Sequence, residues 1–81
     1  MIGIYKITSS SKKIYIGQSR DIRKRFYLYK KYKGKTQPKL YKSFLKYGVE
    51  RHMFEIIKEC SVAELNDLEI YYIKHFDSGK L

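Results

Sequence analysis

The chain has 81 residues, 43% of them hydrophobic, and it carries a formal net charge of +10. This length predicts one domain spanning residues 1–81, and the hydrophobic content favours a folded chain with a modest core over an intrinsically disordered one. No apolar run approaches the roughly 20 residues that a membrane-spanning helix needs, and the single cysteine, Cys60, has no partner for a disulfide within the chain. We therefore expect a soluble, intracellular protein that does not act in a membrane.

The positive charge is concentrated in the first part of the chain. Residues 1–49 contain fourteen Lys and Arg against one acidic residue, Asp21, whereas residues 50–81 contain four basic and seven acidic residues. Such a basic region is typical of proteins that bind a polyanion, and tyrosines interleaved with lysines over residues 27–33 suit contact with nucleic acid. A basic face that is only solvated, or one that binds an anionic membrane surface, is the alternative. The residues predicted to contact nucleic acid are Lys12, Lys13, Arg20, Arg23, Lys24, Lys30, Lys31 and Lys33.

Two strands and a short serine-rich loop are predicted at the N-terminus. Residues 2–8 and 12–18 are rich in Ile and Tyr, which favour strands, and three serines separate them. A turn centred on Ser10 would pair residues whose numbers sum to 20. In that antiparallel register Tyr5 lies directly opposite Tyr15 on one face of the hairpin.

Two helices are predicted next. Ser19 or Asp21 can cap a helix that runs to about Tyr32. A second helix begins at Pro38, which suits the first turn of a helix, and ends at Gly48, which suits the C-terminal cap.

A third strand and a third helix complete the pattern. Residues 52–60 contain an apolar run typical of a strand, and Ser61-Val62-Ala63-Glu64 is a capping box that opens a helix to about Phe76. The order β-β-α-α-β-α predicts an α/β (α+β) fold, in which three helices flank a small three-stranded antiparallel or mixed sheet.

Two charged residues lie on helix faces that should be buried. On a helical wheel Arg25 falls within the apolar side of the first helix, and Glu69 falls within the apolar side of the last. A charged side chain directed at an interior needs a partner or a metal ion. One interpretation is a buried salt bridge between the two, although such a bridge adds little net stability. The other is a functional site.

The chemistry of these residues favours the functional interpretation. A glutamate can hold a divalent cation through oxygen, and an arginine can bind a phosphate with two hydrogen bonds. A phenol beside a cation can lose its proton and activate water. Together with the paired tyrosines, Arg25 and Glu69 supply what the cleavage of a phosphodiester with one metal ion requires.

The motifs that carry these residues resemble those of the GIY-YIG endonuclease superfamily, nearest to the phage and homing endonuclease catalytic domains. The resemblance extends over nearly the whole chain. The matching segments are Gly3-Ile4-Tyr5, Tyr15-Ile16-Gly17, residues 17–25 ending on Arg25, residues 46–56, and residues 68–73 containing Glu69.

The resemblance implies hydrolysis of DNA phosphodiesters with Mg²⁺, or alternatively Mn²⁺, as cofactor. It implies that Tyr5 is the general base, that Tyr15 positions water or phosphate, that Arg25 stabilises the transition state and that Glu69 binds the metal. Many homing-type members carry a histidine four residues after the arginine, where this chain has Tyr29, and excision-repair incision nucleases carry a tyrosine there. Tyr29 is therefore also a candidate catalytic residue.

The resemblance further implies that target specificity resides in a separate domain or a partner protein, and the chain is either minimal or truncated relative to the family. Two other functions remain open from the sequence. One is a non-catalytic DNA- or RNA-binding module on the same fold, and the other is a basic structural component of a ribonucleoprotein.

Overall fold

The computed structural model describes residues 1–32 and 37–80, without the side chains of residues 79 and 80. The elements are β1 (Gly3–Thr8), β2 (Ile14–Ser19), α1 (Ile22–Tyr32), α2 (Pro38–Tyr47), the 3₁₀ turn η1 (Val49–Arg51), β3 (Met53–Glu59), the 3₁₀ turn η2 (Val62–Glu64), α3 (Leu65–His75) and β4 (Gly79–Lys80). The predicted β-β-α-α-β-α order and the α+β class are confirmed. In the described part of the chain, no helix is both long enough and apolar enough to cross a membrane.

The sheet has the strand order β3-β1-β2-β4, with β1 in the interior. β1 pairs antiparallel with both β2 and β3, which gives the predicted three-stranded antiparallel sheet. The two-residue β4 adds a parallel pairing to β2, opposite Tyr15 and Ile16, so the sheet as a whole is mixed. This short strand was not predicted.

The register of the β1–β2 hairpin differs from the prediction. Tyr5 lies opposite Gly17, and Tyr15 lies opposite Ile7, so paired numbers sum to 22. The prediction that Tyr5 and Tyr15 face each other directly was wrong. Because the shift is two residues, both tyrosines still lie on the same face of the sheet.

The loop of the hairpin explains the shift. The amide of Ser9 donates to the carbonyl of Lys13, and the amide of Lys12 donates to the carbonyl of Ser9, each over 2.9 Å. These bonds enclose a three-residue loop in which Lys12 adopts a left-handed conformation with φ of 68°. A turn followed by a left-handed residue is the usual geometry of three-residue hairpin loops.

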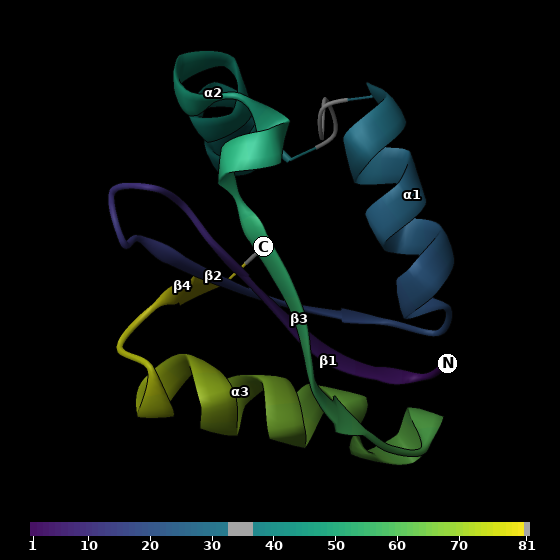
Figure 1. Cartoon of the computed structure of the whole chain (residues 1–81). Helices are drawn as coiled ribbons and strands as arrows, with labels where there is room; N and C mark the ends of the chain where they lie inside the picture. Colours follow the sequence, from purple (N-terminus) through teal and green to yellow (C-terminus); the bar gives the residue numbers. More distant parts are fainter. Residues whose placement is uncertain (33–36, 81) are drawn as a thin grey trace.

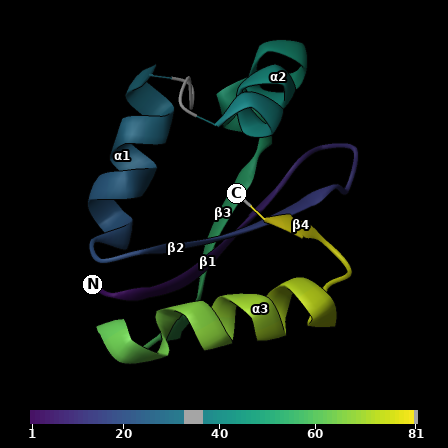
Figure 2. The ribbon, with the colours of Figure 1, turned by 180° about the vertical axis from the view of Figure 1, so that it is seen from behind.

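The helices cover both faces of the sheet. Figures 1 and 2 show α1 and α2 on one face and α3 on the other. Each face has its own apolar core, as expected for a sheet between helical layers. The core on the α1 and α2 face comprises Tyr5, Ile7, Tyr15, Ile22, Tyr29, Leu40 and Phe44, and the core on the α3 face comprises Ile4, Ile16 and Leu65.

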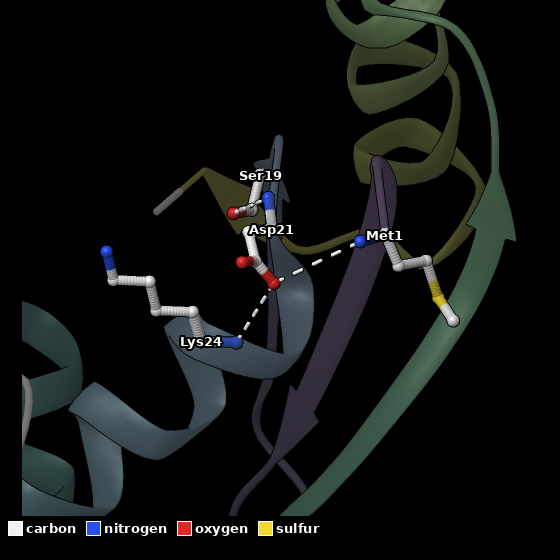
Figure 3. Close-up of polar contacts among 4 residues, drawn as sticks. All are labelled: Met1, Ser19, Asp21 and Lys24. Atoms are coloured by element: carbon white, nitrogen blue, oxygen red, sulfur yellow. Dashed lines mark hydrogen bonds and ion pairs between the residues drawn. The ribbon is translucent and has the colours of Figure 1, made fainter.

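Asp21, one of the two predicted candidates, caps the start of α1, and Ser19 bonds to the amide of Asp21 itself (Figure 3). The carboxylate of Asp21 accepts a hydrogen bond from the amide of Lys24, and the hydroxyl of Ser19 accepts one from the amide of Asp21. The carbonyl of Met1 accepts a further bond from the amide of Ile22 over 2.9 Å. The connection between β2 and α1 is thereby held by polar contacts on both sides, and this connection positions the first turns of α1 beside the end of β2.

The predicted ends of the other helices are also confirmed. α2 begins at Pro38 and is capped by Gly48, whose φ of 88° suits a residue without a side chain and whose amide donates to the carbonyl of Phe44. The carboxylate of Glu64 accepts from the amide of Ser61 over 3.1 Å, as the capping box requires. The box opens a 3₁₀ turn that continues into α3.

Candidate active site

A hydrogen-bonded pair of buried phenols lies on the α1 face of the sheet. Tyr5, on β1, is 1% exposed, and Tyr29, on α1, is 3% exposed. Their hydroxyl oxygens are 2.6 Å apart. The Tyr5 ring also packs edge-on against Phe26, with ring centroids 5.4 Å apart. Tyr29 is therefore the hydrogen-bonding partner of Tyr5.

Gly17 provides the space for the Tyr5 phenol. A Cβ atom at residue 17 would lie 2.5 Å from both the hydroxyl oxygen and the Cζ of Tyr5. Such a distance is far shorter than the ordinary contact between non-bonded atoms. The glycine of the second motif and the tyrosine of the first are thus paired by packing, which the sequence alone did not reveal.

The charges of Arg25 and Glu69 both act on the Tyr5 hydroxyl. Burial raises the pKa of the Tyr5 phenol well above its ordinary value of 10.0, and the neighbouring Tyr29 raises it further. The Arg25 guanidinium lowers this pKa, and the Glu69 carboxylate raises it. The two helical charges predicted to share a site therefore lie within electrostatic range of one phenol, which is protonated at neutral pH in this arrangement.

Arg25 lines a cleft of about 660 Å³ at the open edge of β2. Among the described residues, β4 pairs with Tyr15 and Ile16, and no strand covers residues 17–19 on that side. The α1 and α3 sides of the sheet consequently meet at this edge. The cleft is lined by Gln18, Ser19, Arg20, Asp21, Lys24, Arg25, Leu28, Val62, Leu65 and Asn66.

Glu69 is 2% exposed, so its predicted inward orientation is confirmed. Its Oε1 accepts a hydrogen bond of 3.3 Å from the side-chain amide nitrogen of Gln18 (Nε2), which also donates to Oδ1 of Asn66 over 2.8 Å. Gln18 was not among the predicted site residues. Its position, one residue after Gly17 on the α3 face of β2, is the only signal that the sequence carried for it.

Tyr15 occupies the same core as Tyr5 and Tyr29 and is 4% exposed. It does not line the Arg25 cleft but a second pocket, next to the hairpin loop. The ammonium of Lys13 lies 5.6 Å from the centroid of the Tyr15 ring. Tyr15 therefore lies between the phenol pair and a neighbouring basic surface.

The predicted nucleic-acid contacts are spread over several places. Arg20 and Lys24 line the Arg25 cleft, Lys12 and Lys13 belong to the hairpin loop, and Arg23 is exposed on α1. The ammonium groups of Lys30 and Lys31 lie over the rings of Phe54 and of Tyr27 and Tyr32. Lys33 lies outside the described residues. The lysines of α2 that share a pocket with Lys13 were not predicted.

One carboxylate in this region suits a hard cation. The described residues contain no group of three or more His, Cys, Asp or Glu side chains that could enclose a metal ion. Magnesium commonly takes one or two carboxylates and completes its coordination with water and phosphate oxygens. Glu69, with an oxygen donor and a buried position, fits that mode.

Comparison with known proteins agrees with the motifs. The chain resembles the solved structure of the catalytic domain of the homing endonuclease I-TevI, with a TM-score of 0.79 and 23% sequence identity, over 100% of this chain and 98% of that chain. At this identity the likeness shows the fold. A search of curated proteins found no match. The family model described as the GIY-YIG catalytic domain matches residues 1–81. The chain therefore belongs to the GIY-YIG catalytic domain family, which confirms the predicted endonuclease class.

Proposed function

We propose that residues 1–81 form one domain that hydrolyses DNA phosphodiester bonds by a one-metal mechanism. The observation that carries the proposal is the buried Glu69 carboxylate together with Arg25: they come from helices on opposite faces of the sheet (Figure 1), and both charges act on the pKa of the buried Tyr5 hydroxyl. A pure binding module has no need of a carboxylate that is 2% exposed.

Each residue has a role that suits its environment. Tyr5 accepts the proton of the attacking water once its own hydroxyl has ionised, which the Arg25 charge favours by lowering the pKa of this phenol. Arg25 also binds the phosphate and stabilises negative charge in the transition state. Tyr29 holds the Tyr5 hydroxyl in position through the 2.6 Å hydrogen bond. Tyr15 positions water or phosphate.

Glu69 holds the metal, Mg²⁺ or Mn²⁺, and the amide of Gln18 orients its carboxylate. The bound cation would neutralise charge on the phosphate oxygens and favour ionisation of nearby hydroxyl groups.

The substrate is DNA, bound chiefly through its phosphates. Affinity should fall steeply with salt and depend little on sequence, because phosphate contacts carry no base information. Target specificity then belongs to a separate domain or a partner protein. The residues proposed to contact phosphates are Lys12, Lys13, Arg20, Arg23, Lys24, Lys30, Lys31 and Lys33.

Nicking of supercoiled plasmid in the presence of Mg²⁺ tests the proposal. We expect Arg25→Ala and Glu69→Ala each to lower the cleavage rate at least about a hundredfold, the scale of losing a positioned charge or a metal contact. Exposed residues of the same charge, Arg51 and Asp67, supply the matched controls Arg51→Ala and Asp67→Ala, which should cleave at the wild-type rate.

Two outcomes would contradict it. Wild-type activity in Glu69→Ala would exclude the metal assignment. If the wild-type chain binds DNA but does not cleave it, the chain is a binding module and not an enzyme.

A further inference from the structure

A second basic surface lies apart from the Arg25 cleft. A pocket of about 270 Å³ opens between the hairpin loop and α2, next to the buried ring of Tyr15. Four ammonium-bearing side chains line it, those of Lys13, Lys39, Lys42 and Lys46. We call it the lysine pocket.

The lysine pocket concentrates like charges. Lys39, Lys42 and Lys46 are three and four residues apart, so they share one face of α2, and lysines at such spacings repel each other. None of the described residues that line the pocket is acidic. A site of this kind is unfavourable in the free protein and becomes favourable when a polyanion neutralises it.

The walls of the lysine pocket are held in place. The hydroxyl of Ser43, which is 7% exposed, bonds to Nε2 of His52 over 2.7 Å, and Nδ1 of His52 bonds to the carbonyl of Gly48 over 2.8 Å. These bonds tie α2 to the start of β3. Hydrogen bonds with Ser11 and Lys46 lower the pKa of the half-buried Tyr47 phenol, and the Lys46 ammonium lies 5.2 Å from the centroid of its ring, so side chains of the loop and of α2 meet at Tyr47.

The lysine pocket and the Arg25 cleft lie at opposite ends of β2, so the length of the strand sets the distance between them. The lining of the pocket includes Lys13, just before β2, and Tyr15, near its start. The lining of the cleft includes Gln18, near the end of β2. The five residue-to-residue steps from Lys13 to Gln18 span about 17 Å in an extended strand. That span equals about five base-pair steps of the rise of duplex DNA.

We propose that the lysine pocket binds backbone phosphates of duplex DNA about five base pairs from the phosphate that is cut, so that the duplex lies along β2. The assignment rests on the proposed function, because it takes the scissile phosphate to lie at Arg25. Tyr15 lines the lysine pocket and belongs to the same apolar core as Tyr5 and Tyr29, so it lies between the flanking phosphate site and the proposed catalytic tyrosines.

The salt dependence of binding tests the assignment. The double variant Lys42→Gln/Lys46→Gln removes two exposed charges of the pocket and keeps side chains of similar length. The control Lys58→Gln/Lys74→Gln removes two exposed charges from β3 and α3, so both variants have the same net charge. Affinity for a 20-base-pair duplex would be measured by fluorescence anisotropy at several NaCl concentrations, without divalent metal.

We expect the pocket variant to reduce the slope of log affinity against log salt by about 1.8, since each phosphate contact contributes about 0.9. The control should keep the wild-type slope. In plasmid nicking with Mg²⁺, the pocket variant should raise KM and leave kcat unchanged, because it removes binding away from the reacting atoms.

The outcomes separate this inference from the proposed function. If the wild-type chain cleaves DNA and the pocket variant keeps the full slope, the lysine pocket is not a phosphate site, and the proposed function stands. Equal losses of slope in the pocket variant and the control would show diffuse attraction by net charge and would also overturn the assignment. A wild-type chain that neither binds nor cleaves DNA would overturn both.

Discussion

Gly17 and Tyr5 show how one missing side chain shapes the site. A Cβ at residue 17 would displace the Tyr5 ring, because it would lie 2.5 Å from the hydroxyl oxygen. We expect Gly17→Ala to break the hydrogen bond to Tyr29 and to lower the nicking rate by about a hundredfold, the cost of misplacing a catalytic group by about 1 Å. The unfolding free energy in urea, measured alongside, shows that the variant is folded. Wild-type activity in a folded Gly17→Ala chain would remove Tyr5 from the proposed mechanism.

Single residues also mark the limit of what the sequence predicts. The inward orientation of Glu69 follows from helical periodicity, because a carboxylate on an apolar helix face has few directions available. The contact between Tyr5 and Tyr29 does not follow, since it depends on how α1 crosses β1. Gln18 was missed for a similar reason: its amide reaches Glu69 only because α3 packs on the same face of the sheet.

At the scale of an element, the hairpin loop carries backbone strain. Lys12 has φ of 68°, a left-handed conformation that costs a residue with a side chain about 1–2 kcal/mol. We expect Lys12→Gly to raise the unfolding free energy by about 1 kcal/mol, because glycine adopts this conformation without steric cost. The matched control is Lys13→Gly, which removes the same charge next to it. Lys13 does not have positive φ, so that substitution should destabilise by about 0.5–1 kcal/mol.

Urea denaturation measures both changes. Equal destabilisation by the two substitutions would mean that the left-handed loop is not the source of the strain. The same loop explains why the register was predicted incorrectly. Nothing in the sequence indicates that a lysine will adopt a left-handed conformation. Helix boundaries, in contrast, were predicted at Pro38, Gly48 and Ser61, because these residue types favour helix ends through their backbone or capping chemistry.

At the scale of the whole molecule, the site depends on both layers. Tyr5 and Tyr29 belong to the core beneath α1 and α2, while Glu69 comes from α3 on the opposite face. Side chains of both layers, among them Arg25 of α1 and Asn66 of α3, line the cleft at the edge of β2 that β4 leaves uncovered. The order of elements and the five segments that resemble the family were predictable, because local patterns carry them. The meeting of two layers at one edge was not, because it depends on packing between segments distant in sequence.

The net charge of +10 acts on folding and on binding in opposite directions. The molecule measures 34 × 25 × 18 Å, so at 0.01 M salt, where the screening length is about 30 Å, charges repel across the whole protein. At 0.1 M the length falls to about 10 Å. We expect the Tm of the free protein to rise by a few degrees between 0.01 M and 0.1 M salt, because repulsion between the positive charges is screened. For a domain of this size, that rise corresponds to about 0.5–1 kcal/mol of unfolding free energy.

Affinity for DNA should decrease steeply over the same range of salt, because counterion release favours binding less as salt increases. Circular dichroism melting measures the first effect and anisotropy the second. The variant Lys42→Gln/Lys46→Gln, with two fewer positive charges, should melt at a higher temperature than the wild type at low salt and respond less to added NaCl. A Tm that is unchanged or lower at 0.1 M would mean that the acidic residues after position 49 already neutralise the repulsion between nearby basic residues in the folded protein. The positive charge would then affect solubility and the choice of partner and not the stability of the fold.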